Sequence, residues 1–299
     1  MLGADHSETL ISCLNLARVV EDLGDLEGAK VIIENALAGY ERTVGPSHSE
    51  TLLAAQDLAN LLCTMEDYEG ALTIFKRVLP AMESIVGPDK LTTILVVHNM
   101  GDLLFNMKDY NGAKALYERA LVARELLLGP GHTETLATKY QLAKLLRDIH
   151  EFSAAKVLID DVVLGRFKLL GIERTDTLLS LRLQGSIYTE MELLPEAHEI
   201  LLQTLSQCIK SLGCADELTI DTIDSICKWH RIQNQNIQAL AMIDDFLETH
   251  REQLMIADKA VNRRYKSIRR GIVAQIDGSG QGGGSDQGDG SGQSDESDQ

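Results

Sequence analysis

The stretch Gly45-Pro46-Ser47-His48-Ser49-Glu50-Thr51-Leu52 recurs, with small changes, at a fixed step of forty-two residues. Three of its columns run unbroken through six units: a glycine, a threonine six residues later, and an alanine twenty-six residues later. The glycines are Gly3, Gly45, Gly87, Gly129, Gly171 and Gly213. The threonines are Thr9, Thr51, Thr93, Thr135, Thr177 and Thr219, and the alanines are Ala29, Ala71, Ala113, Ala155, Ala197 and Ala239. Such regular self-similarity indicates a repeat array, in which each unit packs on its neighbours.

Each unit predicts two helices. In the third unit, Gly87-Pro88 precedes an apolar pattern over residues 92–107, and a second pattern covers residues 110–128 after a break at Asp109. Apolar residues in both patterns are three and four positions apart, which is typical of amphipathic helices. Small residues fourteen places after the glycine should let the two helices approach closely; they are Ala17, Ala59, Gly101, Ala143, Gly185 and Cys227.

The helix ends carry recurring signals. We expect a hydroxyl four places after the glycine to cap the first helix of its unit. These residues are Ser7, Ser49, Thr133 and Thr175. Asp25, Asp67 and Asp109 are expected to cap the second helix in the same way. The repeated glycine suits a helix C-terminus, where a left-handed backbone is favoured.

The chain should therefore comprise six repeats over residues 1–253, starting near 3, 45, 87, 129, 171 and 213. Residues 254–272 continue one apolar stripe, and residues 251–270 hold seven bases against two acids. We expect a C-terminal capping helix over 254–273, because terminal units of an array need covering. Contact with a membrane surface or an acidic partner is the alternative for this basic helix. Residues 274–299 consist almost entirely of Gly, Ser, Gln and Asp and predict a disordered tail.

Composition narrows the function. The formal net charge is −17, which argues against general nucleic-acid binding. Five scattered cysteines without a CxxC pair indicate a reducing, cytoplasmic or nuclear compartment, and no stretch predicts a membrane span. We find no nucleophile with a nearby base and no P-loop, so neither an enzyme nor a cofactor is expected. His6, His48 and His132 share one column and are spread along the array, which favours loop contacts near the helix start over a metal site.

The two-helix unit resembles the tetratricopeptide repeat. The forty-two-residue form with G-x-x-H-x-E-T-L, seen at Gly3–Leu10, Gly45–Leu52 and Gly129–Leu136, is similar to the repeat of kinesin light chains. The resemblance covers residues 2 to about 253. It implies an all-α fold, a right-handed TPR-like α-solenoid of six helix-turn-helix repeats, whose first helices line a concave groove for a peptide or partner domain.

In the family, groove positions lie chiefly eleven, fifteen and eighteen residues after the glycine, on one helix face. The candidate groove residues are Asn60, His98, Asp102, Phe105, Tyr140, Lys144, Arg147 and Arg182. One hypothesis is an acidic peptide that pairs with Lys144, Arg147 and Arg182. Phe105 and Tyr140 would then be aromatic anchors. A solvated helix face with chance charges is the alternative.

The leading function is a non-enzymatic protein–protein interaction scaffold or adaptor. Association with a kinesin heavy chain follows only by family analogy. The alternative is the sensor or regulatory repeat end of a larger nucleotide-binding switch protein. Met1-Leu2-Gly3 stands at a repeat boundary, so the first helix should expose part of a face that other units cover. This predicts a terminal piece of a longer protein, self-association at that end, or a truncated gene model.

Overall fold

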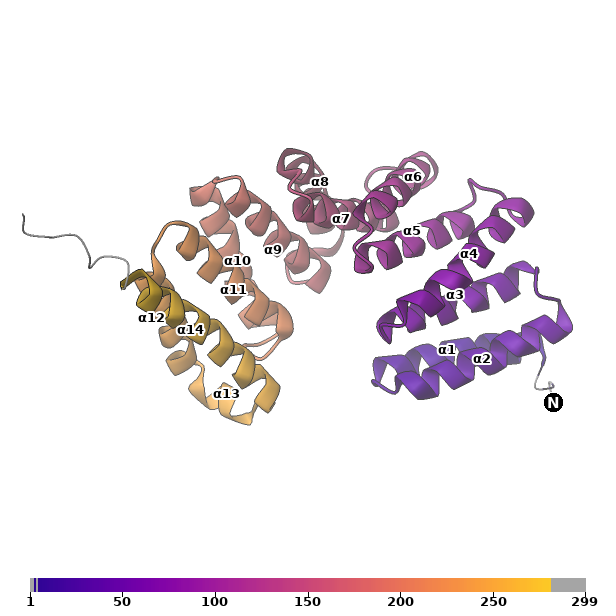
Figure 1. Cartoon of the computed structure of the whole chain (residues 1–299), viewed down its shortest axis with the longest axis horizontal. Helices are drawn as coiled ribbons and strands as arrows, with labels where there is room; N and C mark the ends of the chain where they lie inside the picture. Colours follow the sequence, from indigo (N-terminus) through magenta and orange to yellow (C-terminus); the bar gives the residue numbers. More distant parts are fainter. Residues whose placement is uncertain (1–2, 4, 281–299) are drawn as a thin grey trace, which may run out of the picture. The chain divides into compact units, whose positions relative to one another are not determined.

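The computed structural model describes residue 3 and residues 5–280, the last three of them as backbone only. This part of the chain is built from α-helices and holds no strand. It divides into two compact units after Gly171. Figure 1 shows the helices of each unit as successive antiparallel pairs. Within the described residues, no helix combines the length and apolarity that crossing a membrane requires.

The first unit contains four helical hairpins. Its helices are α1 Ser7–Asp22, α2 Leu26–Thr43, α3 Ser49–Thr64, α4 Tyr68–Ile85, α5 Leu91–Asn106, α6 Tyr110–Leu128, α7 Thr133–Asp148 and α8 Phe152–Leu170. Each hairpin packs on the next, because α2 contacts α3, α4 contacts α5, and α6 contacts α7. The first helices α1, α3, α5 and α7 also contact one another in order. They therefore form one continuous layer within this unit.

The second unit contains two further hairpins and the C-terminal helices. Its helices are α9 Thr175–Glu190, α10 Leu194–Ser211, α11 Glu217–Ile232, α12 Asn236–Thr249, α13 Arg251–Ile256 and α14 Lys259–Gly280. The last of these, α14, packs against both α11 and α12. Tyr265 and Ile272 of α14 are fully buried in the core of this unit.

Small residues at the helix crossings confirm the predicted close approach. Ala59 and Ala71 are completely buried between α3 and α4. Gly101 stands in the same column as Ala59, and a Cβ atom at this position would lie 2.9 Å from the ring of Tyr117. The glycine therefore makes room for an aromatic ring where three of the other units carry an alanine.

The threonine column also has a structural cause in some units. The hydroxyl of Thr51 donates a hydrogen bond of 2.7 Å to the carbonyl oxygen of Gly45, and Thr219 does the same to Gly213. Gly45 has a φ of 94°, in the left-handed region expected at the helix end. The two columns thus mark one hydrogen-bonded loop that joins successive repeats.

The prediction of hydroxyl caps on the first helices is wrong. His6, His48 and His132 occupy the N-cap positions, and the Nδ1 of each accepts the backbone N–H two residues later. The backbone is still extended at His6 and His48, and the helices begin at the next residue. Ser7 and Ser49 are therefore the first helical residues and not the caps. Arg174 is the N-cap residue of α9, which has no side-chain cap, so Thr175 does not cap it.

The predicted aspartate caps are confirmed. Asp25, Asp67 and Asp109 accept the backbone N–H groups of Gly28, Gly70 and Gly112.

The C-terminal boundaries also require correction. The expected single helix over 254–272 is divided at Ala257, whose backbone is extended, and Asp258 then accepts the N–H of Ala260 at 3.1 Å. Residues 274–280, placed in the disordered tail, continue α14. The reason is that Ile276 extends the apolar stripe of Ile272 by one turn and packs on the same core. The rest of the predicted tail, 281–299, lies outside the described residues.

Candidate functional site

Seven of the eight candidate residues lie on the layer of first helices in the first unit. Asn60 is on α3, three are on α5, and three are on α7. The side of α1, α3, α5 and α7 that carries residues eleven, fifteen and eighteen positions after the repeat glycine is here termed the first-helix face. Arg182, the eighth candidate, lies on α9 in the second unit.

Asp102 is the centre of a polar network on this face. Tyr117 Oη donates a hydrogen bond of 2.5 Å to Asp102 Oδ1, and Gln141 Nε2 donates another of 3.1 Å to the same oxygen. Burial raises the pKa of Asp102 to about 6, although the Tyr117 hydrogen bond and the charge of Lys144 oppose this rise. The network therefore holds a desolvated carboxyl group among α5, α6 and α7.

His98 completes the network. Its Nε2 lies 3.6 Å from Asp102 Oδ2, and its ring centroid lies 5.6 Å from that of Tyr117. Burial lowers the pKa of His98 to about 3, and the charge of Arg124 contributes, so the imidazole is neutral. Its buried Nδ1 has no hydrogen-bond partner. The face thus contains a buried ring nitrogen without a hydrogen-bond partner.

Phe105 is largely covered by its own chain. Its ring is 8% exposed, and Lys144 Nζ lies 4.8 Å from its centroid. Tyr110 packs on the same ring with centroids 5.7 Å apart. Tyr140 on α7 contacts the guanidinium of Arg166, whose Cζ is 4.8 Å from the ring centroid. Both predicted aromatic anchors therefore already have cationic neighbours.

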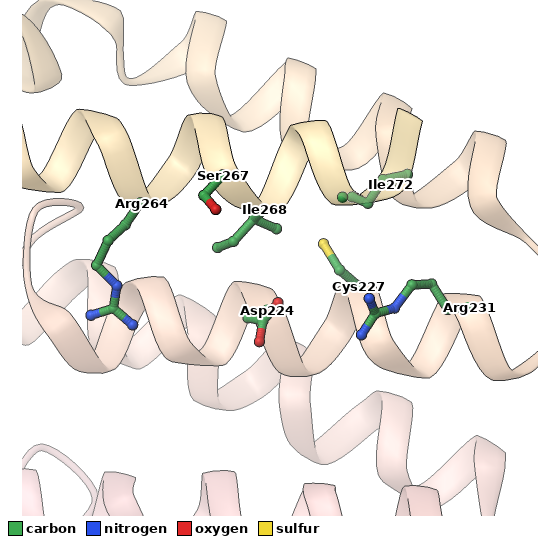
Figure 2. A pocket seen from close by; sticks show the side chains of 8 residues that line it. Asp224, Cys227, Arg231, Arg264, Ser267, Ile268 and Ile272 are labelled. Carbon is green, nitrogen blue, oxygen red and sulfur yellow. The ribbon is translucent and has the colours of Figure 1, made fainter. Parts of the chain in front are cut away.

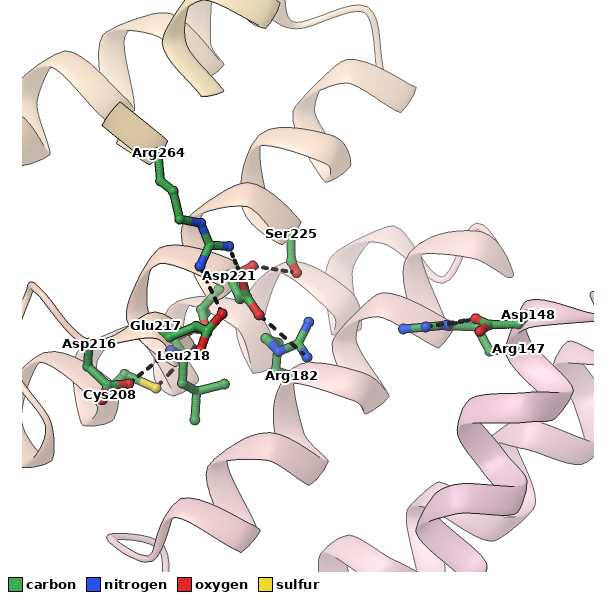
Figure 3. A network of polar contacts seen from close by, with 11 residues as sticks. Arg147, Asp148, Arg182, Cys208, Asp216, Glu217, Leu218, Asp221, Ser225 and Arg264 are labelled. Atoms are coloured by element: carbon green, nitrogen blue, oxygen red, sulfur yellow. Dashed lines mark hydrogen bonds and ion pairs between the residues drawn. The ribbon is translucent and has the colours of Figure 1, made fainter. Parts of the chain in front are cut away.

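Two of the predicted positive charges face carboxylates of the chain itself (Figure 3). Arg147 NH2 lies 2.7 Å from Asp148 Oδ1 in the first unit. In the second unit, Arg182 NH2 lies 4.0 Å from Asp221, which also accepts a hydrogen bond of 2.6 Å from Arg264 on α14. An acidic partner would have to compete with these ion pairs.

A pocket of about 270 Å³ opens on the first-helix face at α1, α3 and α5, with one lining residue, Ile33, from α2. Its polar lining comes from Arg18, Glu21, Gln56, Asp57, Asn60 and Asn99. Leu14, Ile33 and Leu95 form its apolar part. Asn60 is the only candidate residue in this lining.

The second unit has a pocket of about 340 Å³ between α11 and α14. Figure 2 shows Asp224 and Arg231 of α11 below Ser267 and Ile268 of α14. Asp224 and Arg231 are eleven and eighteen positions after Gly213, so α14 lies over part of the surface that family positions mark as groove. In the described part of the chain, no group of three or more His, Cys, Asp or Glu residues could hold a metal ion.

Sequence reasoning missed two members of the Asp102 network. Tyr117 is on α6, a second helix, so a search restricted to first-helix columns does not reach it. Gln141 stands one position beyond the predicted column. The one sequence signal for Tyr117 is Gly101, a glycine in a column where alanine is common.

Comparison with known proteins identifies relatives of this fold. The sequence model described as tetratricopeptide repeat matches residues 3–84 and 92–159. No curated protein sequence matches the chain.

Among solved structures, the kinesin light chain TPR-like repeats of Podosopora anserina are 21% identical, with a TM-score of 0.59 over 69% of this chain and 98% of that one. BtubC (BKLC) from P. vanneervenii is 15% identical, with a TM-score of 0.57 over 89% of this chain and 99% of that one. A Signal Transduction ATPase with Numerous Domains that has a tetratricopeptide repeat sensor, from Pyrococcus horikoshii, is 9% identical. Its TM-score is 0.67 over 92% of this chain and 43% of that one. At these identities the likeness concerns the fold.

Proposed function

Because this chain belongs to the tetratricopeptide repeat family, we propose that its first unit is a non-enzymatic scaffold or adaptor that binds a peptide segment on the first-helix face. The observation that supports this proposal is a pair of buried polar atoms on that face without hydrogen-bond partners, Gln56 Oε1 and His98 Nδ1. Leaving a buried polar atom without a partner costs about 1–3 kcal/mol. An extended peptide carries backbone N–H and C=O groups, which supply both a donor and an acceptor for such atoms on binding.

Lys144 is the proposed contact for a carboxylate of the peptide. Arg147 and Arg182 pair with Asp148 and Asp221 of the chain itself, so a peptide carboxylate would have to displace these partners to reach them. Lys144 Nζ lies 4.8 Å from the centroid of the Phe105 ring, and its charge acts on the Asp102 carboxyl group. A peptide carboxylate at this position would form a charge-assisted hydrogen bond.

Peptides selected by display on the intact protein test this proposal. We expect Lys144→Glu to weaken their binding, measured by fluorescence anisotropy, by at least about tenfold, or about 1.4 kcal/mol. Lys76→Glu makes the same charge change at an exposed position of the second helix α4 and should leave affinity unchanged. Equal affinities of both variants and the parent protein would reject the first-helix face as the binding surface.

A second surface, the exposed apolar face of α1, is a candidate for self-association of the protein. Leu16 and Val19 of α1 are 53% and 54% exposed, and Leu23, the C-cap residue of α1, is 80% exposed. The equivalent residues Leu58 and Leu61 of α3 are buried against the preceding hairpin. We propose that a second copy covers this α1 face. Sedimentation equilibrium of the parent chain and of Leu16→Glu/Val19→Glu tests this, with a monomeric parent chain as the contradicting result.

We also propose that the protein is located in the cytoplasm, a reducing compartment. All five cysteines are free, and three of them are buried. Free buried thiols are typical of compartments in which disulfides do not persist. Fractionation of cells that express a tagged chain would contradict this location if the protein were recovered from an oxidising compartment.

The alternative function is the sensor repeat end of a larger nucleotide-binding switch protein. Its support is the fold likeness, over 92% of this chain, to the repeat-containing ATPase of Pyrococcus horikoshii. Full-length transcript sequencing tests it, because a P-loop encoded in the same reading frame would support this role. If the same reading frame encodes a heptad coiled coil and not a P-loop, the result would instead support a motor adaptor that binds a kinesin heavy chain.

A further inference from the structure

The pocket at α1, α3 and α5 differs from the rest of the first-helix face in having a buried amide at its wall. Gln56 is 3% exposed, and its Oε1 accepts no hydrogen bond. This carbonyl oxygen is desolvated without a compensating hydrogen bond in the free protein. The pocket therefore selects for a ligand group that donates hydrogen bonds.

The charges around the pocket are unbalanced. Asp57 and Glu21 contribute two carboxylates to the lining, whereas Arg18 contributes one guanidinium. Burial raises the pKa of Asp57, the positive charge of Arg18 opposes this, and the negative charge of Glu21 adds to it. Glu21 also accepts a hydrogen bond of 3.2 Å from Thr64 Oγ1 on α3, which fixes it at the pocket edge. An incoming positive charge would relieve the repulsion between the two carboxylates.

The size and the apolar wall indicate one side chain rather than a whole small molecule. Ligand pockets for drug-sized molecules measure roughly 300–1,000 Å³, and this one of about 270 Å³ lies below that range. Leu14, Ile33 and Leu95 offer an apolar surface to an aliphatic stem. Lysine and arginine combine such a stem with a head that only donates hydrogen bonds.

We propose that this pocket is the specificity site for a lysine or arginine side chain of the bound peptide, with the cationic head between Gln56 Oε1 and the Asp57 carboxylate. This inference rests on the proposed peptide-binding function and adds the chemistry of one peptide residue to it. It also changes the expected partner from a simply acidic peptide to one that carries a basic residue at α1–α3. The carboxylate-binding position at Lys144 then belongs to another part of the same peptide.

The probes for this proposal are capped pentapeptides, Ac-Ala-Ala-X-Ala-Ala-NH2, in which X is lysine, arginine, norleucine or glutamate. Side-chain amide signals of Gln56, Asn60 and Asn99 in two-dimensional NMR spectra report binding at the pocket. We expect saturable shifts with the lysine and arginine peptides and none with norleucine or glutamate. Equal shifts with norleucine would show that the pocket takes an apolar stem without charge recognition and would overturn the proposal.

Two pocket variants and one control variant sharpen the test. Asp57→Asn should weaken lysine-peptide binding about tenfold, whereas Glu34→Gln, the loss of an exposed carboxylate on α2, should leave it unchanged. Gln56→Leu should weaken it as well. In the parent protein, the pKa of Asp57 should fall when the lysine peptide binds, which requires no variant to fold. An unchanged Asp57 pKa at saturation would contradict the proposed contact.

The outcome of the pentapeptide test can be distinguished from the outcome of the Lys144→Glu test of the proposed function. If display-selected peptides depend on Lys144 but the lysine pentapeptide causes no shift at Gln56, the pocket assignment fails and the scaffold proposal stands. If the lysine pentapeptide binds but Lys144→Glu changes nothing for the selected peptides, the pocket assignment stands and the proposed carboxylate contact fails.

Discussion

Tyr117 on α6 donates a hydrogen bond of 2.5 Å to Asp102 on α5, so a second helix supplies the phenol that holds a carboxyl group of the first-helix face. The space for this ring exists because residue 101 is glycine. A packing position and a surface position of the same repeat are therefore linked. This link makes the Asp102 network sensitive to changes in the hairpin core.

Tyr117→Phe should destabilise the fold and raise the pKa of Asp102 above about 6, because the phenol favours the charged carboxylate. A hydrogen bond to a charged group contributes about 1.5–3 kcal/mol, which sets the expected loss of unfolding free energy. Urea unfolding and an NMR titration of the carboxyl carbon measure the two effects. Tyr110→Phe removes the same atom from a ring that packs on Phe105 and should change stability by less than about 0.5 kcal/mol.

Gly101→Ala should destabilise the protein by about 1–3 kcal/mol, because the new methyl group would overlap the Tyr117 ring. Gly131→Ala is the matched control, since nothing lies within 4 Å of a Cβ atom at that position. Thermal unfolding by circular dichroism compares the two variants. Equal melting temperatures would show that the ring moves aside without loss, contrary to the close packing described.

Thr51→Val and Thr93→Val should differ although they change the same repeat column. Thr51 donates to the Gly45 carbonyl oxygen at 2.7 Å, so its loss should cost about 1–2 kcal/mol. The hydroxyl of Thr93 is buried and has no partner, so valine there should be neutral or stabilising. Urea unfolding of both variants gives the comparison. A loss at residue 93 as large as that at residue 51 would contradict the assignment of the hydrogen bond.

His98 should give stability a pH dependence. Burial lowers its pKa from 6.5 to about 3, so between these values the unfolded chain binds a proton that the folded chain does not. The unfolding free energy contributed by His98 therefore rises with pH across this window, by at most about 3 kcal/mol from pH 4 to pH 7.

The raised pKa of Asp102 gives the unfolding free energy the opposite dependence on pH. Its folded carboxyl group keeps a proton between about pH 4 and pH 6 that the unfolded chain has lost, so its contribution falls as pH rises. The stability difference between the parent protein and His98→Gln isolates the histidine. This difference should grow from pH 4 to pH 7 in urea-unfolding experiments, and parallel curves would refute a neutral, buried His98.

The helical hairpins were predictable because their signals repeat six times, but several local features were not. The turn inside each hairpin has a left-handed residue at one fixed column, which holds Gly24, Glu66, Lys108, His150, Glu192 and Asn234. Five of these are not glycine, so the backbone conformation is imposed by the packed hairpin rather than by the residue type. A column without a shared residue gives no signal in one sequence.

The candidate site was predictable only in part. Helical spacing placed His98, Asp102 and Phe105 on one face, because residues four and three apart share a side of a helix. The spacing does not reveal that Arg147 pairs with Asp148, nor that Arg182 shares Asp221 with Arg264 of α14. Those ion pairs depend on side-chain directions and, in the second unit, on contacts between residues of different helices that are up to forty-three positions apart in sequence.

The most direct test of peptide binding on the first-helix face is a map of backbone amide shifts when a display-selected peptide is added to the intact protein. The account predicts saturable shifts along α1, α3, α5 and α7, which include Gln56, Asn60, Asp102 and Lys144. Shifts confined to the second helices α2, α4, α6 and α8 would contradict it.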